Sequence, residues 1–194
     1  MQYFNIDTIA DAGGGEYCFS DHTPDGIDTR WYRLATGKPF GADYPADTDE
    51  VRLRLGDDYP GLKLPSFIGN TTGMLVVNSK TADTILSHKV GRTERLPFLL
   101  IDHKGRIHSR DYVFLNPLER IGCLNLELSE VRRSRKGEIK EVSKVVIDKT
   151  KQPDLIDLFR LAEEPNVYLF SETVVAALRK AGGTNFVFTA VESR

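Results

Sequence analysis

The stretch MLVVNSKTADTILSHKV, residues 74–90, changes from a strand pattern to a helix pattern. Residues 74–77 form a compact apolar run of strand length. Asn78 or Ser79 can then cap a helix that runs to about His88, since both side chains accept hydrogen bonds from free backbone N–H groups. Ala82, Ile85 and Leu86 recur on one face of that helix. The stretch therefore predicts a strand followed by an amphipathic helix.

Patterns typical of hairpins follow toward the C-terminus. Residues 96–101 predict a strand, and Pro97 within it indicates an edge strand or a late start, because proline donates no hydrogen bond to a ladder. Residues 103–106 predict the turn and residues 112–115 the returning strand. Further strands are predicted over residues 123–128, 139–147 (after a Lys136-Gly137 turn), 158–161, 167–170 and 186–188, and a second helix begins after Ser171 and ends before Gly182.

The first 62 residues are less regular. The triplet Gly13-Gly14-Gly15 is interpreted as a turn and not as a phosphate loop, because a strand pattern follows it where a phosphate loop needs a helix. Residues 31–34 and 51–55 are strand candidates. Strands outnumber helices and cluster in hairpins, which predicts an α+β fold with a mainly antiparallel sheet and two to three helices. We expect residues 1–194 to form a single domain, with an irregular β-rich part over 1–62 and a regular core over 63–194.

Charge and composition argue against several partners. The 194 residues carry a formal net charge of −2, whereas nucleic-acid binders usually carry a basic excess that neutralises phosphates. No apolar run approaches the length of about 18 residues that a membrane span requires, and the first residues do not resemble a signal peptide. We expect no nucleic-acid partner, no membrane partner and a cytoplasmic location. Cys18 and Cys123 are expected to be free buried thiols.

Local motifs for catalysis, cofactors or metals are absent from the sequence. The histidines lack the one-turn spacing of a zinc helix, and no Gly-x-Ser-x-Gly elbow occurs. We therefore expect no cofactor, no metal and a protein that acts by binding. A site assembled from residues far apart in the chain would escape this search. The alternative hypothesis is a hydrolase-like enzyme with a dispersed site around His103 and His108 and a nearby carboxylate.

Two charged stretches are candidate surfaces. Acidic side chains dominate residues 43–58, and three interpretations stay open for them: a solvated loop, which is favoured, an acidic face for a basic partner, and a calcium site that lacks the EF-hand pattern. The basic run RRSRK, residues 132–136, is interpreted as a solvated hairpin turn and not as a nucleic-acid contact, because glutamates flank it.

Residues 64–80, LPSFIGNTTGMLVVNSK, and the helix directly after them resemble an immunity-protein family of bacterial polymorphic toxin systems, formerly a domain of unknown function. Later motifs agree in order: DHKG at 102–105, YVFLNP at 112–117, CLNLELSE at 123–130, LFRL at 158–161, the helix at 171–183 and FVF at 186–188. The resemblance covers about residues 60–190. It implies a cytoplasmic protein that protects the producing cell by binding its own toxin, with no cofactor and no catalytic residues.

The partner implied by this resemblance is a cognate toxin whose active site the protein would occlude. We expect the contacts in the N-terminal part, where aromatic residues would be anchors and acidic residues would form a steering rim. The candidates are Trp31, Asp43, Tyr44, Asp47, Asp49, Glu50, Asp57, Asp58 and Tyr59. The three aromatic residues also suit partly buried core positions. A homo-oligomeric structural protein, such as a homodimer, is a third hypothesis.

Overall fold

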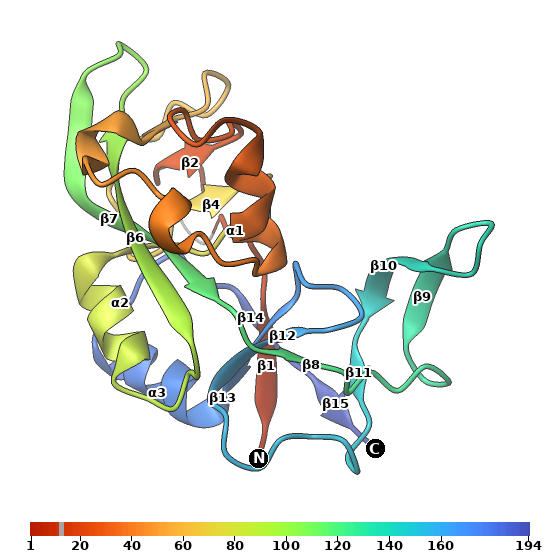
Figure 1. The fold of residues 1–194 in the computed structure, drawn as a ribbon. Helices are drawn as coiled ribbons and strands as arrows, with labels where there is room; N and C mark the ends of the chain where they lie inside the picture. Colours follow the sequence, from red (N-terminus) through yellow and green to blue (C-terminus); the bar gives the residue numbers. More distant parts are fainter. Residues whose placement is uncertain (12–13) are drawn as a thin grey trace.

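The computed structural model describes residues 1–11 and 14–194 and places most of its strands in two sheets (Figure 1). The first sheet has the order β3 (Arg52–Arg54), β6 (Thr93–Ile101), β7 (Ile107–Pro117) and β5 (Val76–Asn78). The second has the order β14 (Phe188–Ala190), β1 (Tyr3–Ile6), β13 (Tyr168–Ser171), β12 (Leu158–Leu161) and β8 (Arg120–Ile121). Within them β3 and β8 pair in parallel with their neighbours and the other pairs are antiparallel. This confirms the α+β class.

Two helices join the sheets, and both have the predicted caps. Helix α2 (Ser79–Leu86) packs on the first sheet, α3 (Glu172–Lys180) packs on the second, and the helices pack against each other (Figure 1). The Asn78 side chain accepts a hydrogen bond from Thr81 N at 2.8 Å, and the Ser171 hydroxyl accepts one from Val174 N at 3.4 Å. Gly182 follows α3 with φ of +74°, the left-handed conformation expected of a residue that closes a helix.

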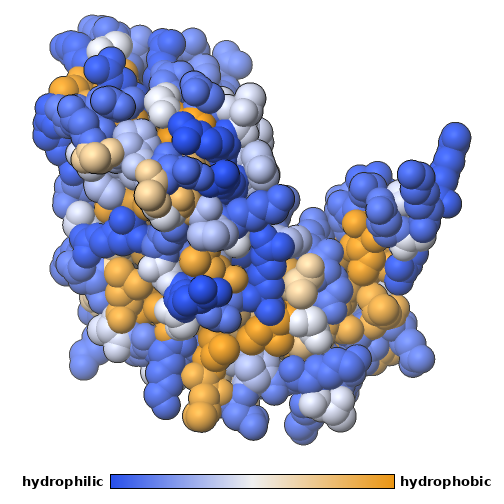
Figure 2. Space-filling view, viewed as in Figure 1, coloured by the Kyte–Doolittle hydropathy of each residue, from blue (hydrophilic) through white to orange (hydrophobic). Residues whose placement is uncertain are grey.

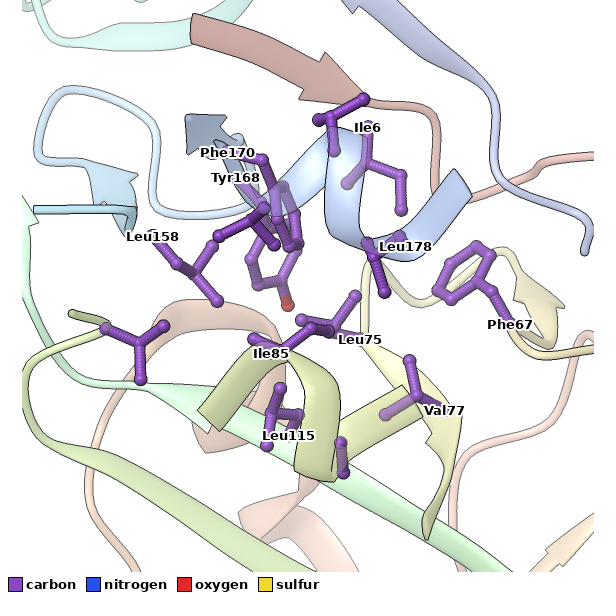
Figure 3. Close-up of a cluster of buried hydrophobic side chains, with 14 of the residues drawn as sticks. Ile6, Phe67, Leu75, Val77, Ile85, Leu115, Leu158, Tyr168, Phe170 and Leu178 are labelled. Atoms are coloured by element: carbon purple, nitrogen blue, oxygen red, sulfur yellow. The ribbon is translucent and has the colours of Figure 1, made fainter. Parts of the chain in front are cut away.

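One buried cluster binds these four layers together. Figure 3 shows Ile85 and Leu178 of the two helices pointing toward Leu115 of the first sheet and Leu158 and Phe170 of the second. All are less than 3% exposed, and a fully buried side chain of this size contributes about 1.5–3 kcal/mol relative to an exposed one. The N-terminal strand β1 adds Ile6 to the cluster, so the beginning of the chain is part of the C-terminal sheet.

Pro97 lies in an interior strand, contrary to the prediction of an edge strand or a late start. Strand β6 begins at Thr93 and has neighbours on both sides. Strand β3, however, pairs with β6 only from Leu99 to Ile101, so the outer side of Pro97 faces no strand. The Tyr44 hydroxyl instead donates a hydrogen bond to the Pro97 carbonyl at 2.7 Å. The proline therefore occupies a locally unpaired section of an interior strand.

Two strand predictions are wrong. Residues 31–34 lie in a 3-10 turn (Asp28–Trp31) and the short helix α1 (Tyr32–Thr36), whose carbonyls at Leu34 and Ala35 accept hydrogen bonds from the distant Arg160. Residues 123–128 form a single bridge at Leu124 and then a turn, because Asn125 Oδ1 accepts hydrogen bonds from the N–H groups of residues 127 and 128. The predicted strand at 186–188 begins only at Phe188.

The remaining elements are short, except for one arm. They are β2 (Phe19–Ser20) paired with β4 (Gly69–Asn70), β11 (Val146–Ile147) paired with β15 (Glu192–Ser193), and the 3-10 turns Gly41–Asp43 and Thr48–Glu50. The arm is the hairpin of β9 (Glu130–Arg133) and β10 (Ile139–Lys144), which stands away from the rest of the molecule with its Lys136-Gly137 turn as predicted (Figure 1). No helix within residues 1–11 and 14–194 is long and apolar enough to cross a bilayer.

Candidate binding site

Several of the predicted acidic residues already form contacts within the protein. Asp43 Oδ2 lies 2.8 Å from Arg33 Nη1, and this hydrogen-bonded cation lowers the pKa of the Asp43 carboxyl. Asp49 lies 2.6 Å from Arg110 Nη1. Asp47 caps the turn that follows it, since its Oδ1 accepts a hydrogen bond from Asp49 N at 3.0 Å. These three carboxylates therefore also hold local structure.

Two of the three predicted aromatic anchors pack inward. Trp31 and Tyr44 are partly buried against the cluster under the first sheet. The hydroxyl of Tyr44 donates a hydrogen bond to the Pro97 carbonyl, and burial raises the pKa of Tyr44. Both side chains therefore contribute to the core, which is the alternative role that the sequence suggested for these aromatic residues.

The last three predicted residues form the most accessible group. Tyr59 is 41% exposed, and its ring lies 4.1 Å from the ring of Phe19, centroid to centroid. Asp57 and Asp58 are exposed and make no hydrogen bond or ion pair with any other described residue. Glu50 is exposed as well. Asp58 and Tyr59 thus offer a free charge beside an accessible aromatic ring.

Beside Asp58 and Tyr59 the structure contains a cavity of about 380 Å³. Its lining comes from three segments that are far apart in the sequence: Ile9, Asp11, Gly14, Gly15, Tyr17, Cys18, Phe19, then Asp58, Tyr59, Pro60, and finally Asn185. We call the group Ile9, Asp11, Tyr17, Phe19, Asp58 and Tyr59 the pocket face. Sequence reasoning found only Asp58 and Tyr59 of this group, since no periodicity or spacing links residue 11 to residue 58.

Backbone contacts fix the N-terminal wall of the cavity. Ala10 and Asp11 have φ of +57° and +86°, which side-chain-bearing residues rarely adopt. Asp11 Oδ1 accepts a hydrogen bond from Gly15 N at 2.9 Å, and Asp11 N donates to Asn185 Oδ1 at 3.2 Å. Gly13, the first residue of the glycine triplet, lies outside the described residues, while Gly14 and Gly15 form the predicted turn with positive φ.

Gly69 explains how the wall can lie so close to the core. A Cβ atom at Gly69 would lie 2.2 Å from the carbonyl oxygen of Ile9, a distance at which atoms clash. The next residue, Asn70, is fully buried and donates its backbone N–H to Thr8 O at 2.7 Å. Its side chain hydrogen-bonds Ile68 O, Met74 O and Met74 N, as expected of an asparagine in a turn. The segment 64–80 therefore contacts the backbone of residues 8 and 9 and so holds the N-terminal wall of the cavity.

His103 and His108 support the other wall. His103 Nε2 lies 3.2 Å from Gly56 O and 3.0 Å from Tyr59 O, and His108 Nε2 lies 2.9 Å from Leu62 O. Because all three acceptors are carbonyls, each ring nitrogen is a donor. The two histidines of the enzyme hypothesis therefore hold the segment 56–62 in place.

Both thiols of the chain are buried. Cys18 and Cys123 are free and at most 1% exposed, as expected, and burial raises the pKa of each thiol to about 12. A thiol that stays protonated at neutral pH is a poor nucleophile. Among the residues that the structure describes, no three His, Cys, Asp or Glu side chains gather in a way that could hold a metal ion.

The β9–β10 arm is the second charged surface. Its basic run is exposed, but only residues 134–136 lie in the turn, because Arg132 and Arg133 belong to β9. Glutamates of the same hairpin pair with two of the arm's cations, in Arg132–Glu141 at 2.8 Å and Lys140–Glu138 at 3.3 Å. Figure 2 shows a hollow between the arm and the rest of the molecule, with apolar surface at the base of the arm. Sequence reasoning missed this projection because it depends on how far a hairpin extends beyond the core.

Comparison with known proteins identifies the family. No curated protein matches the chain. The profile of an immunity protein family, Imm11, matches residues 28–193, which include both sheets except β1, both long helices and the arm. The chain belongs to the immunity protein family Imm11.

Proposed function

We propose that this protein binds one cognate toxin in the cytoplasm of the producing cell and neutralises it by occluding the toxin's active site. Membership of an immunity protein family over residues 28–193 is the observation that supports the proposal. The chemistry of the described chain is consistent with it: His103 and His108 donate to loop carbonyls and the thiols are buried. A protein that acts by occlusion needs a complementary surface and no reactive group.

The pocket face is the centre of the proposed interface. It combines an accessible aromatic ring, Tyr59, with an apolar neighbour, Ile9, which is 54% exposed, and with the free carboxylate of Asp58. Interface hot spots are typically aromatic residues in well-packed positions that a polar rim surrounds. A rigid wall also favours affinity, because little side-chain and loop order has to be gained on binding.

The other predicted residues are proposed to surround this centre. Asp47, Glu50 and Asp57 would supply the rim and attract a basic toxin surface, which raises the association rate more than the final affinity. Asp43 and Asp49 would contribute less, since Arg33 and Arg110 already compensate their charges. Trp31 and Tyr44 would act through packing beneath the surface.

Co-expression with the toxin encoded by the neighbouring gene tests the proposal. We expect the two proteins to co-purify and the immunity protein to restore growth. The double variant Asp58→Asn with Tyr59→Ala should weaken binding by at least about tenfold, the effect of losing about 1.4 kcal/mol. The matched control, Asp154→Asn with Leu155→Ala, changes an exposed acidic residue and its exposed apolar neighbour outside the pocket face. A wild-type protein that neither co-purifies nor restores growth would overturn the function, whereas equal binding by both double variants would overturn the interface.

A further inference from the structure

We propose that the cavity of the pocket face binds the guanidinium group of an arginine side chain, which rests on the proposed function because the toxin would supply that side chain. The cavity of about 380 Å³ lies at the small end of the range of ligand pockets, roughly 300–1,000 Å³. It can therefore take one long side chain or a small ligand. The chemical groups of its walls decide which ligand it binds.

The walls are aromatic and acidic. Tyr17, Phe19 and Tyr59 provide rings, Asp11 and Asp58 provide carboxylates, and the described lining residues include no lysine, arginine or histidine. Aromatic faces attract cations, and a guanidinium group stacks on them better than an ammonium group does. The two carboxylates disfavour an anion, so phosphate groups and acidic peptides do not fit this chemistry.

The carboxylate oxygens are available for a ligand. Asp58 makes no hydrogen bond or ion pair within the described part of the chain. Asp11 accepts the Gly15 N–H with Oδ1, and among the described residues nothing donates to its Oδ2. A guanidinium group carries five N–H donors in a planar fork, so it can serve carboxylates on two sides while its plane stacks on a ring.

Two contacts between a cation and a tyrosine ring within the chain have the same chemistry, one at the edge of the pocket face itself and one in the interior. Lys63 Nζ lies 5.0 Å from the centroid of the Tyr17 ring and 3.4 Å from Glu16 Oε2, so this ring already contacts one cation beside a carboxylate. In the interior, the Arg160 guanidinium carbon lies 4.2 Å from the centroid of the Tyr168 ring. Both pairs show that tyrosine faces of this protein accept a cation at short range.

The site is reachable from outside, and hydrogen bonds join both of its walls to other segments of the chain. Tyr59 and Ile9 at the cavity are 41% and 54% exposed, so a side chain from a partner can enter between them. His103 holds Tyr59 O, and Asn185 holds Asp11 N, so both walls are tied to the core. A fixed slot of this kind favours a planar group over a flexible one.

A titration of the purified protein alone tests the inference without the toxin. The probe is Nα-acetyl-arginine amide, followed by two-dimensional amide NMR, with Nα-acetyl-citrulline amide as the uncharged isostere and Nα-acetyl-lysine amide as the second cation. We expect concentration-dependent shifts of the amides of Gly14, Gly15, Asp58 and Tyr59 with the arginine probe, with a dissociation constant in the millimolar range. We expect no such shifts with the citrulline probe and at least threefold weaker binding of the lysine probe.

Variants locate the site. Asp58→Asn should weaken binding of the arginine probe at least fivefold, and Asp154→Asn, an exposed change outside the lining, should leave it unchanged. Asp58 is exposed and forms no ion pair with the described residues, so its replacement should leave the thermal midpoint of unfolding unchanged, which a melting curve verifies. Absence of saturable shifts, equal binding of citrulline or lysine, or an unaffected Asp58→Asn variant would overturn the inference.

The outcome is separable from that of the proposed function. If the toxin binds but the arginine probe does not, the inference fails and the proposed function stands. If the probe binds at Asp58 but the neighbouring gene product neither co-purifies nor is neutralised, the function fails and the site stands.

Discussion

The guanidinium carbon of Arg160 lies 4.2 Å above the ring of Tyr168, and both side chains are fully buried. Arg160 Nη1 and Nη2 donate hydrogen bonds to Ala35 O and Leu34 O, and Nε donates to Pro117 O. The last turn of α1 and the end of β7 therefore meet at one charged side chain of β12. A buried cation is tolerated here because the ring and the carbonyls replace the water that it loses.

Arg160→Met should destabilise the fold strongly, because it leaves buried carbonyls of α1 without donors. We expect the free energy of unfolding to fall by about 3–5 kcal/mol, because each buried carbonyl that loses its donor costs about 1–3 kcal/mol. Urea denaturation measures the loss. Arg179→Met is the control, because Arg179 lies exposed in α3, and its effect should stay within about 0.5 kcal/mol. Equal effects of the two variants would show that the Arg160 contacts contribute little.

The Asp102 carboxyl should make the free energy of unfolding vary with pH in the acidic range. Backbone N–H groups of Arg106 and Lys104 and the Arg106 side chain donate to its carboxylate, and they lower the pKa of Asp102 to about 2. The unfolded chain has a pKa of about 3.9 at this residue. A lowered pKa stabilises the folded state above about pH 4, and this contribution disappears as the pH falls through about 2.

The comparison with Asp102→Asn isolates this effect. Urea denaturation at a series of pH values should show the wild type more stable than Asp102→Asn at pH 6, with the difference shrinking below pH 4 and smallest near pH 2. A difference that stays constant over this range would mean that the carboxylate is not the source of the stabilisation.

His103→Ala should loosen the segment 56–62 while leaving the fold intact. The ring nitrogen of His103 donates to Gly56 O and Tyr59 O, so its loss releases both carbonyls near the surface. We expect faster hydrogen exchange of the amides in this segment and weaker binding of the toxin. His88→Ala is the control, because the His88 ring forms no hydrogen bond with the described residues. If His103 were instead a catalytic residue, His103→Ala would lose enzymatic activity while hydrogen exchange in the segment 56–62 stayed unchanged.

Local patterns predicted the two long helices and the central hairpin, whereas a long-range contact explains the error at residues 31–34. The caps of α2 and α3 and the hairpin of β6 and β7 depend on neighbours in sequence, so Asn78, Ser171 and Gly105 were sufficient signals. Residues 31–34 have the composition of a strand, but Arg160, more than a hundred residues away, satisfies the carbonyls of the helix that they form.

The candidate site was predictable only in part for the same reason. Asp58 and Tyr59 were found because they belong to an acidic and aromatic stretch. Asp11 and Tyr17 come close to them through long-range contacts, among them those of Gly69 with Ile9 and of Lys63 with Cys18, which no local pattern encodes. The engagement of Asp43 and Asp49 with arginines could not be read either, since their partners Arg33 and Arg110 were not distinguished from other surface cations.

The β9–β10 arm gives a test between the two concave surfaces of the molecule. The exposed cations Arg135 and Lys136 at its tip form no ion pair with the described residues, so Arg135→Ser with Lys136→Ser should change the free energy of unfolding by less than about 0.5 kcal/mol. If the toxin binds the pocket face, its dissociation constant should also change less than twofold, as isothermal titration calorimetry would show. If the hollow between the arm and the body is the interface, the same variant should weaken binding and reduce its dependence on salt, because charges at an interface rim act through screened attraction. The pocket face is acidic and the arm tip is basic, so one charged surface of the toxin cannot be complementary to both. The size of the effect on the dissociation constant therefore identifies which surface the toxin contacts.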